Sequence, residues 1–126
     1  MHRSRLGGLI IDCQTGDLKA AAAFWGTALG LRTRPSADPE DTGYVRFETA
    51  PNDLDIEVQQ VTHASRVHLD IETDDIEAEV SRLEKLGAKR LKKVHSWWVM
   101  EAPSGHRFCV VSAQRSEFAT EANVWT

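Results

Sequence analysis

The feature that most constrains the fold is an internal repeat, which two helical segments reveal. Asp17 opens the first segment and Gly30 closes it, whereas Asp75 opens the second segment. Gly87 closes that second segment, so the starts lie 58 residues apart and the ends 57. A starting aspartate accepts hydrogen bonds from the free N–H groups of the first turn, and a closing glycine adopts the left-handed conformation that ends a helix. The chain is therefore predicted to hold two copies of one structural unit.

Each helical segment has one strand pattern before it and three after it. Residues 8–14 lead into the first helix, and residues 66–72 lead into the second. Turns of similar chemistry, at residues 50–53 and 102–105, join the last two strands of each copy. The order predicts an α+β fold of two tandem βαβββ modules forming a curved, cup-like sheet with helices on its outer faces. The remaining strand candidates are residues 31–34, 44–48 and 54–61 in the first copy, and 89–94, 97–100 and 107–112 in the second.

The length of 126 residues suits a single domain. Within it we expect the first module at about residues 6–62, the second at about 65–113 and a C-terminal tail at 114–126. The first copy has the longer loop, and we place its extra residues at 36–41. The tail carries two aromatic residues, Phe118 and Trp125, so we expect it to be pinned across its own domain or laid on a partner. Of these alternatives we favour a homodimer.

Composition argues against several partners. Hydrophobic residues make up 41% and charged residues 27% of the chain, as in ordinary globular proteins. The net charge of −4 comes from interspersed acids and bases, so no nucleic-acid surface is expected. The apolar stretch from Leu6 to Ile11 is too short for a signal peptide or a membrane span, which predicts a cytoplasmic protein with no membrane partner. Cys13 and Cys109 are expected to be buried free thiols.

Alternation along the strands predicts a polar face and an apolar face for each sheet. In the second copy Val67, Leu69 and Ile71 alternate with polar residues, and the apolar set is expected to face the helix. A spacing of 52 residues between the matching turns pairs the third strands of the copies and assigns Trp98 and Met100 to the polar face. Phe24 and Trp25 of the first helix are expected to be core. The predicted ligand-binding residues on the polar face are Asp12, Arg46, Asp70, Glu72, Trp98, Met100 and Cys109.

Three stretches now resemble a known family. Residues 9–31, with Asp17 and Gly30, look like the opening of a glyoxalase-like module, and residues 67–88 look like the opening of a second one. Residues 97–110 are similar to the closing hairpin of that module. The chain thus resembles the glyoxalase, bleomycin resistance and dioxygenase superfamily of vicinal-oxygen-chelate (VOC) proteins. That superfamily includes isomerases, lyases, dioxygenases and non-catalytic drug-binding proteins, so the resemblance implies the fold more firmly than the activity.

The resemblance also implies four positions where metal-dependent members place ligands. In this sequence they hold Ile10, Glu57, His68 and Cys109. Isoleucine cannot bind a metal, so a site for a hard divalent ion would keep only His68 and Glu57 as ligands. We therefore expect no cofactor and no stoichiometric metal ion, with a divalent metal as the alternative. A three-ligand zinc site of His68, Glu57 and Cys109 is the sharper form of that alternative.

Two classes of function follow. In the first, the chain binds a small oxygenated or aromatic molecule in the cup between the modules without a complete metal site, and Glu57 and His68 are the residues predicted to act as catalytic base or as anchors. In the second, it is a metal-dependent lyase, isomerase or dioxygenase-type enzyme. A third role for His68 is a simple hydrogen bond to Asp70 or Asp12. The metal content of the purified protein would separate the two classes.

Overall fold

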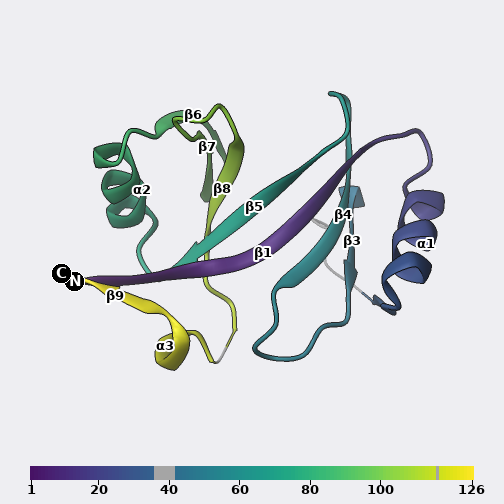
Figure 1. The fold of residues 1–126 in the computed structure, drawn as a ribbon, viewed down its shortest axis with the longest axis horizontal. Coiled ribbons are helices and arrows are strands. Elements are labelled where there is room, and N and C mark those ends of the chain that lie inside the picture. Colours follow the sequence, from purple (N-terminus) through teal and green to yellow (C-terminus); the bar gives the residue numbers. More distant parts are fainter. Residues whose placement is uncertain (36–41, 116) are drawn as a thin grey trace. The chain divides into compact units, whose positions relative to one another are not determined.

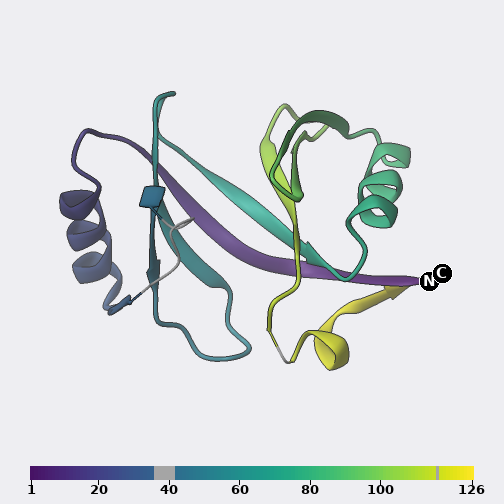
Figure 2. The same ribbon diagram turned by 180° about the vertical axis from the view of Figure 1, so that it is seen from behind.

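A computed structural model describes residues 1–35, 42–115 and 117–126 (Figures 1 and 2). The loop expected at residues 36–41 lies outside the described residues. Each long helix is preceded by one strand and followed by three, which confirms the α+β class and the two βαβββ modules. The elements are β1 (His2–Gln14), α1 (Leu18–Leu29), β2 (Thr33–Arg34), β3 (Tyr44–Phe47), β4 (Asp55–Val61), β5 (Arg66–Thr73), α2 (Ile76–Lys85), β6 (Lys89–Val94), β7 (Trp97–Glu101), β8 (Arg107–Ser112), α3 (Phe118–Glu121) and β9 (Asn123–Trp125).

The chain divides into two compact units, and the boundary runs through β1. The first-module unit holds residues 8–67, and the second-module unit holds residues 1–7 and 68–126. Strand β1 begins at His2, six residues before the strand pattern that the sequence suggested. Its first residues therefore belong to the second-module unit, although they come first in the chain.

In the first-module unit the strands run in the order β2-β3-β4-β1. Residues Gly8–Gln14 of β1 pair with β4 in parallel, and β3 pairs with β4 antiparallel. Helix α1 packs against β3 and β4 (Figure 1). Trp25 packs on this core as expected, but Phe24 is 62% exposed and the prediction that it is buried is wrong. The buried core consists of Ile11, Cys13, Phe47 and Val58.

In the second-module unit β5 is followed across the sheet by β8, β7 and β6. Strand β5 pairs with β8 in parallel, and β7 is antiparallel to both its neighbours. Helix α2 packs against β8 and β6 (Figure 2). The lysine-rich strand β6 ends this strand order, where charged side chains suit an exposed edge. The buried core consists of Val80, Leu83, Met100 and Val110.

The helix caps agree with the repeat. The carboxylate of Asp17 accepts a hydrogen bond from the N–H of Ala20 at 3.0 Å, and Gly30 ends α1 with a φ of 70°. In the same way Asp75 accepts from the N–H of Ala78 at 3.0 Å, and Gly87 follows α2 with a φ of 102°. Both glycines occupy the left-handed region, where a side chain would strain the backbone.

One prediction of side-chain direction is wrong. Trp98 and Met100 pack in the core beneath α2, and Met100 has no exposed surface. The register gives the reason: Trp98 lies opposite Val110 and Met100 opposite Phe108, whereas Val99 lies opposite Cys109. Neighbours across an antiparallel pair point to the same face. Trp98 and Met100 therefore share the helix-facing side with Val110, and they are not ligand-binding residues of the polar face.

The C-terminal tail folds back on its own chain. Strand β9 pairs antiparallel with the start of β1, so the two termini lie side by side (Figure 1). The indole N–H of Trp125 donates to Ser4 Oγ at 2.8 Å, and the guanidinium of Arg82 lies 3.9 Å from the centre of the Trp125 ring. Phe118 is 6% exposed. Of the two alternatives for the tail, pinning across its own domain is the one observed, and a homodimer stays a prediction.

Candidate functional site

Three of the predicted site residues come together on the polar face of the second-module unit. His68 and Asp70 alternate with the apolar residues of β5, and Asp70 lies opposite Cys109 of β8 in the parallel register. His68 Nε2 and Asp70 Oδ1 are 3.4 Å apart, and their side chains are 12% and 20% exposed. One ligand atom from each of His68, Asp70 and Cys109 lies within 4.8 Å of the others. Cys13 and Cys109 form no disulfide, and Cys13 is buried as expected, whereas Cys109 is only half-buried.

These three side chains offer a nitrogen, an oxygen and a sulfur atom. A carboxylate beside an imidazole holds the ring in one orientation and stabilises its protonated form, which suits proton transfer or the binding of an anion. The same three atom types are the ones that zinc accepts in sites where three protein ligands leave one position open. The arrangement can therefore serve acid–base chemistry or metal binding.

The predicted residues of the first-module unit form separate pairs. Glu57 lies opposite Arg46, and the carboxylate Oε1 is 3.4 Å from Arg46 Nε. Asp12 Oδ2 is 3.8 Å from Arg66 Nε, and the side chain of Asp12 is 2% exposed. Each of these two carboxylates therefore lies near the positive charge of an arginine.

Glu72 belongs to a different environment from His68, although both point to the same face of β5. Its carboxylate Oε1 accepts a hydrogen bond from Arg5 Nε at 2.5 Å and lies 3.6 Å from Arg115 Nη2. Both arginines were missed from the sequence. Arg5 precedes the strand pattern that was recognised, and Arg115 lies in the tail, so neither showed an alternation that could assign it to a face.

The four-ligand site that the fold family implies does not fit this chain. Ile10 lies opposite Glu57 in the parallel register, is 2% exposed and has no atom that binds a metal. The acidic position of the last strand holds Cys109. A reduced site of His68, Asp70 and Cys109 does fit the donor preferences of zinc, with Asp70 as a ligand where the sequence suggested Glu57.

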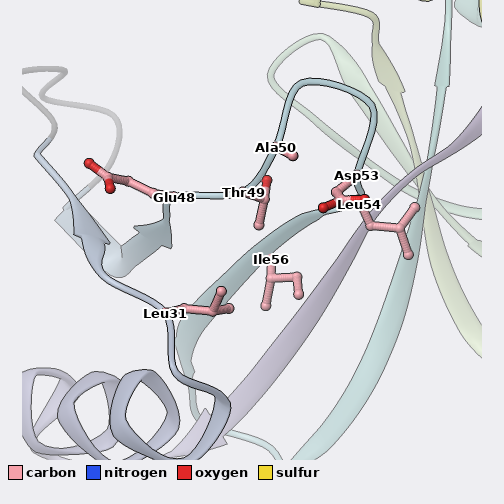
Figure 3. A pocket seen from close by; sticks show the side chains of 7 residues that line it. All are labelled: Leu31, Glu48, Thr49, Ala50, Asp53, Leu54 and Ile56. Atoms are coloured by element: carbon pink, nitrogen blue, oxygen red, sulfur yellow. The ribbon is translucent and has the colours of Figure 1, made fainter.

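A pocket in the first-module unit was not predicted. It lies where the turn before β4 meets the end of α1, and its volume is about 460 Å³. Figure 3 shows the side chains of Leu31, Leu54 and Ile56 forming its apolar part, with Thr49 and Asp53 above them. Leu31 and Ile56 also pack against the core under α1, so the pocket opens on the helix side of the sheet and not on the polar face. Nothing in the sequence pattern distinguishes these residues from ordinary core and turn positions.

No helix among the described residues is long and apolar enough to cross a membrane.

The chain is similar to known proteins both in sequence pattern and in fold. A family model described as a glyoxalase-like domain matches residues 8–111. A hypothetical protein from Bacillus halodurans is similar in structure, with a TM-score of 0.64 and 13% identity over 90% of this chain and 98% of that chain. Methylmalonyl-CoA epimerase from Mycobacterium tuberculosis has a TM-score of 0.59 and 14% identity over 86% of this chain and 88% of that chain. A variant of the Streptomyces coelicolor epimerase in complex with 2-nitronate-propionyl-CoA has a TM-score of 0.56 and 15% identity over 87% and 98% of the two chains. A search among curated proteins found no significant match.

Proposed function

The chain belongs to the glyoxalase-like domain family, and from this premise we propose that it binds a small oxygenated or aromatic molecule on the polar face that carries His68. The observation that supports the proposal best is the cluster of His68, Asp70 and Cys109. The side chains are largely shielded from solvent yet keep polar atoms of three kinds together. Solved structures of the same fold include epimerases in complex with coenzyme A esters, which is consistent with a small-molecule ligand.

In this proposal His68 is the principal acid–base or anchoring group. Asp70, 3.4 Å away, orients its ring. Glu57 is the second candidate, but the guanidinium of Arg46 lies 3.4 Å from its carboxylate. A carboxylate with a cation beside it is better suited to anchoring a ligand than to accepting a proton. If the chain is an enzyme, we therefore assign proton transfer to His68 and the reaction to the lyase or isomerase class.

A screen of small oxygenated and aromatic compounds, followed by two-dimensional NMR, tests the proposal. A ligand of the polar face should shift the signals of His68, Asp70 and Cys109, and binding should fall at least about tenfold in His68→Ala, which is the loss of one charge-assisted hydrogen bond. His106→Ala is the matched control, because His106 is an exposed turn residue hydrogen-bonded to Ser104. Ligands that shift only residues outside this face would refute the proposal.

A metal-dependent enzyme of the same superfamily is the second candidate, and the three donor atoms within 4.8 Å favour it. A bound zinc ion would supply Lewis-acid catalysis, with His68, Asp70 and Cys109 holding it. Calorimetric titration with zinc, nickel, manganese and ferrous iron separates the candidates. Binding of one ion per chain that is lost in His68→Ala and Cys109→Ser, but kept in His106→Ala, would establish the metal site. Binding that the cluster variants leave unchanged would exclude it.

A further inference from the structure

A bulge in strand β6 turns one lysine away from the helix and onto the polar face of the second-module unit. Arg90 lies on the helix side of the sheet, where its Nη2 atom donates to the Glu77 carboxylate of α2 at 2.6 Å. Side chains alternate along a regular strand, so Lys92, two residues later, would share this side. The pairing shifts between Arg90 and Lys92, however, and Lys92 lies opposite Val99. The extra residue, Leu91, therefore reverses the direction of Lys92, and bulges often redirect a side chain in this way beside functional sites.

Lys92 ends a row of side chains that crosses the polar face from the His68 cluster. Val99 lies opposite Cys109, and Cys109 lies opposite Asp70. The row therefore runs Asp70, Cys109, Val99 and Lys92, one residue on each of the neighbouring strands β5, β8, β7 and β6 (Figure 1). Neighbouring strands are about 4.8 Å apart, which places the Cα atoms of Lys92 and Cys109 about 10 Å apart. A small molecule that lies across Val99 can therefore reach both the cluster and the lysine.

The positive charge of Lys92 is exposed and available. Lys92 has no hydrogen-bond or ion-pair partner among the residues that the structure describes. Strand β7 places the carboxylate of Glu101 on the same face, but Arg107 Nη1 donates to Glu101 Oε2 at 2.6 Å. The edge strand needs no redirected lysine to stay solvated, because Lys89 and Lys93 are exposed on it as well. Lys92 is therefore the cation that this face presents to an anion from solution.

The surface between Lys92 and the His68 cluster carries apolar side chains. Val99 lies in this interval, and Trp97 is beside it on the same face, two residues earlier on β7. Both side chains are half-buried, so each keeps some surface open to solvent. The imidazole ring of His95 lies 5.3 Å from the indole ring of Trp97. Aliphatic and aromatic surface of this kind suits a flat apolar group, with a cation at one end and polar atoms at the other.

We propose that Lys92 binds the anionic group of a flat aromatic molecule, whose ring lies on Val99 and Trp97 and whose other end reaches His68. The inference rests on the proposed function and narrows its ligand from oxygenated or aromatic molecules to aromatic anions. The apolar residues hold the ring, and the ammonium group selects the charged compound over an uncharged one of the same shape. Because Lys92 is exposed, this selection should weaken as the salt concentration rises.

The test is an NMR titration of the full chain with 4-hydroxybenzoate and with 4-hydroxybenzamide, its uncharged counterpart, at constant ionic strength. The indole N–H signal of Trp97 should shift in a saturable manner, whereas that of Trp98, which packs in the core under α2, should not. We expect the carboxylate to bind about fivefold more tightly than the amide, which corresponds to one exposed ion pair. Lys92→Gln should abolish this preference, and Lys92→Arg should keep it.

Lys93→Gln is the matched control, because Lys93 is the adjacent exposed lysine and lies opposite Trp98 on the helix side. It should leave the preference for the carboxylate unchanged. No saturable shift of Trp97, equal affinity for the two compounds, or the same loss of preference in Lys93→Gln would overturn the inference. If the compound screen finds a ligand at His68 that Lys92→Gln binds as tightly as the unchanged protein, the inference fails and the proposed function stands. If Lys92→Gln weakens the binding of 4-hydroxybenzoate but His68→Ala does not, the proposed role of His68 fails and the lysine site stands.

Discussion

The two modules share one backbone plan but differ in what stands at equivalent places on their polar faces. In the first module Ile10 lies beside Glu57, whose carboxylate faces Arg46. In the second module His68 lies with Asp70 and Cys109, three groups that can exchange a proton or hold a metal. The first module therefore presents an apolar residue and a balanced charge, whereas the second concentrates reactive side chains. The two modules thus share their strand order but not the side chains of their polar faces.

The modules also differ in how their sheets are secured. The second-module unit holds the start of β1 together with β9 and α3, and it buries a charged network around Glu79. His2 Nε2 donates to Glu79 Oε1 at 2.8 Å, and Arg82 donates to both carboxylate oxygens at 2.8 Å. Among its described residues, the first-module unit has no comparable buried network and no terminal strand of this kind.

The largest effect is expected in the core of the second module. Met100→Ala should lower the free energy of unfolding by about 3 kcal/mol, because a fully buried side chain under α2 leaves a cavity. Val99→Ala, on the opposite face of the same strand, should cost about 1 kcal/mol or less. Chemical denaturation measures both. Equal losses of stability in the two variants would contradict the burial of Met100 under α2.

A smaller, pH-dependent effect is expected from Glu79. Burial acts to raise the pKa of Glu79, but hydrogen bonds from Arg82, His2 and Ser4 outweigh it and hold the pKa below its ordinary value. The ionised carboxylate then stabilises the fold above the pKa of the unfolded chain, and this stabilisation is lost as the pH falls through the lower, folded pKa.

Glu79→Gln should therefore cost about 2 kcal/mol at neutral pH and progressively less in acid. Denaturation curves at several pH values between about 3 and 7 give the measurement. Glu77→Gln is the control: Arg90 lowers the pKa of Glu77 through hydrogen bonds, but the residue is on the surface and its loss should be minor. A cost for Glu79→Gln that does not change with pH would contradict the assigned role.

The packing of Trp125 of β9 against Ser4 and Arg82 should contribute less to the free energy of unfolding. Trp125→Ala removes the hydrogen bond to Ser4 and the stacking on Arg82, which together correspond to about 1.5 kcal/mol. Val124→Ala, at a side chain that is 49% exposed, should have little effect. Hydrogen exchange should show faster opening of β1 near His2–Ser4 only in the tryptophan variant. Unaltered exchange there would mean that β9 does not secure the strand.

The smallest effect is expected in the first module. Arg46→Gln should change the free energy of unfolding by about 0.5 kcal/mol, since the arginine is 41% exposed and water screens the pair. Chemical denaturation of Arg46→Gln and of the unchanged protein measures this difference. A loss as large as that of Met100→Ala would contradict a pair that water screens.

Val67 and Leu69 were expected to face the helix together with Ile71, but they are 53% and 45% exposed, and only Ile71 packs against the core under α2. Local patterns in the sequence were enough to predict the repeat, both helices with their caps, and the face of β8. Their signals are short-range: a capping aspartate, a closing glycine, and alternation along one strand. The face of β7 was predicted wrongly, because one spacing of 52 residues was applied to both strands of the hairpin. The registers show that β8 follows that spacing but that Trp98 corresponds to Val45, 53 residues earlier. A difference of one residue in a turn reverses the faces of a strand.

The sequence by itself determined which elements form and which residues of β5 share a face, because periodicity is a property of consecutive residues. Only the tertiary structure decided that the first residues of β1 pair with β9, that Glu72 lies between Arg5 and Arg115, and that Cys109 lies beside Asp70. These contacts join residues that are far apart in the chain. Their partners are selected by strand register and by the burial of charge, and neither leaves a local pattern in the sequence.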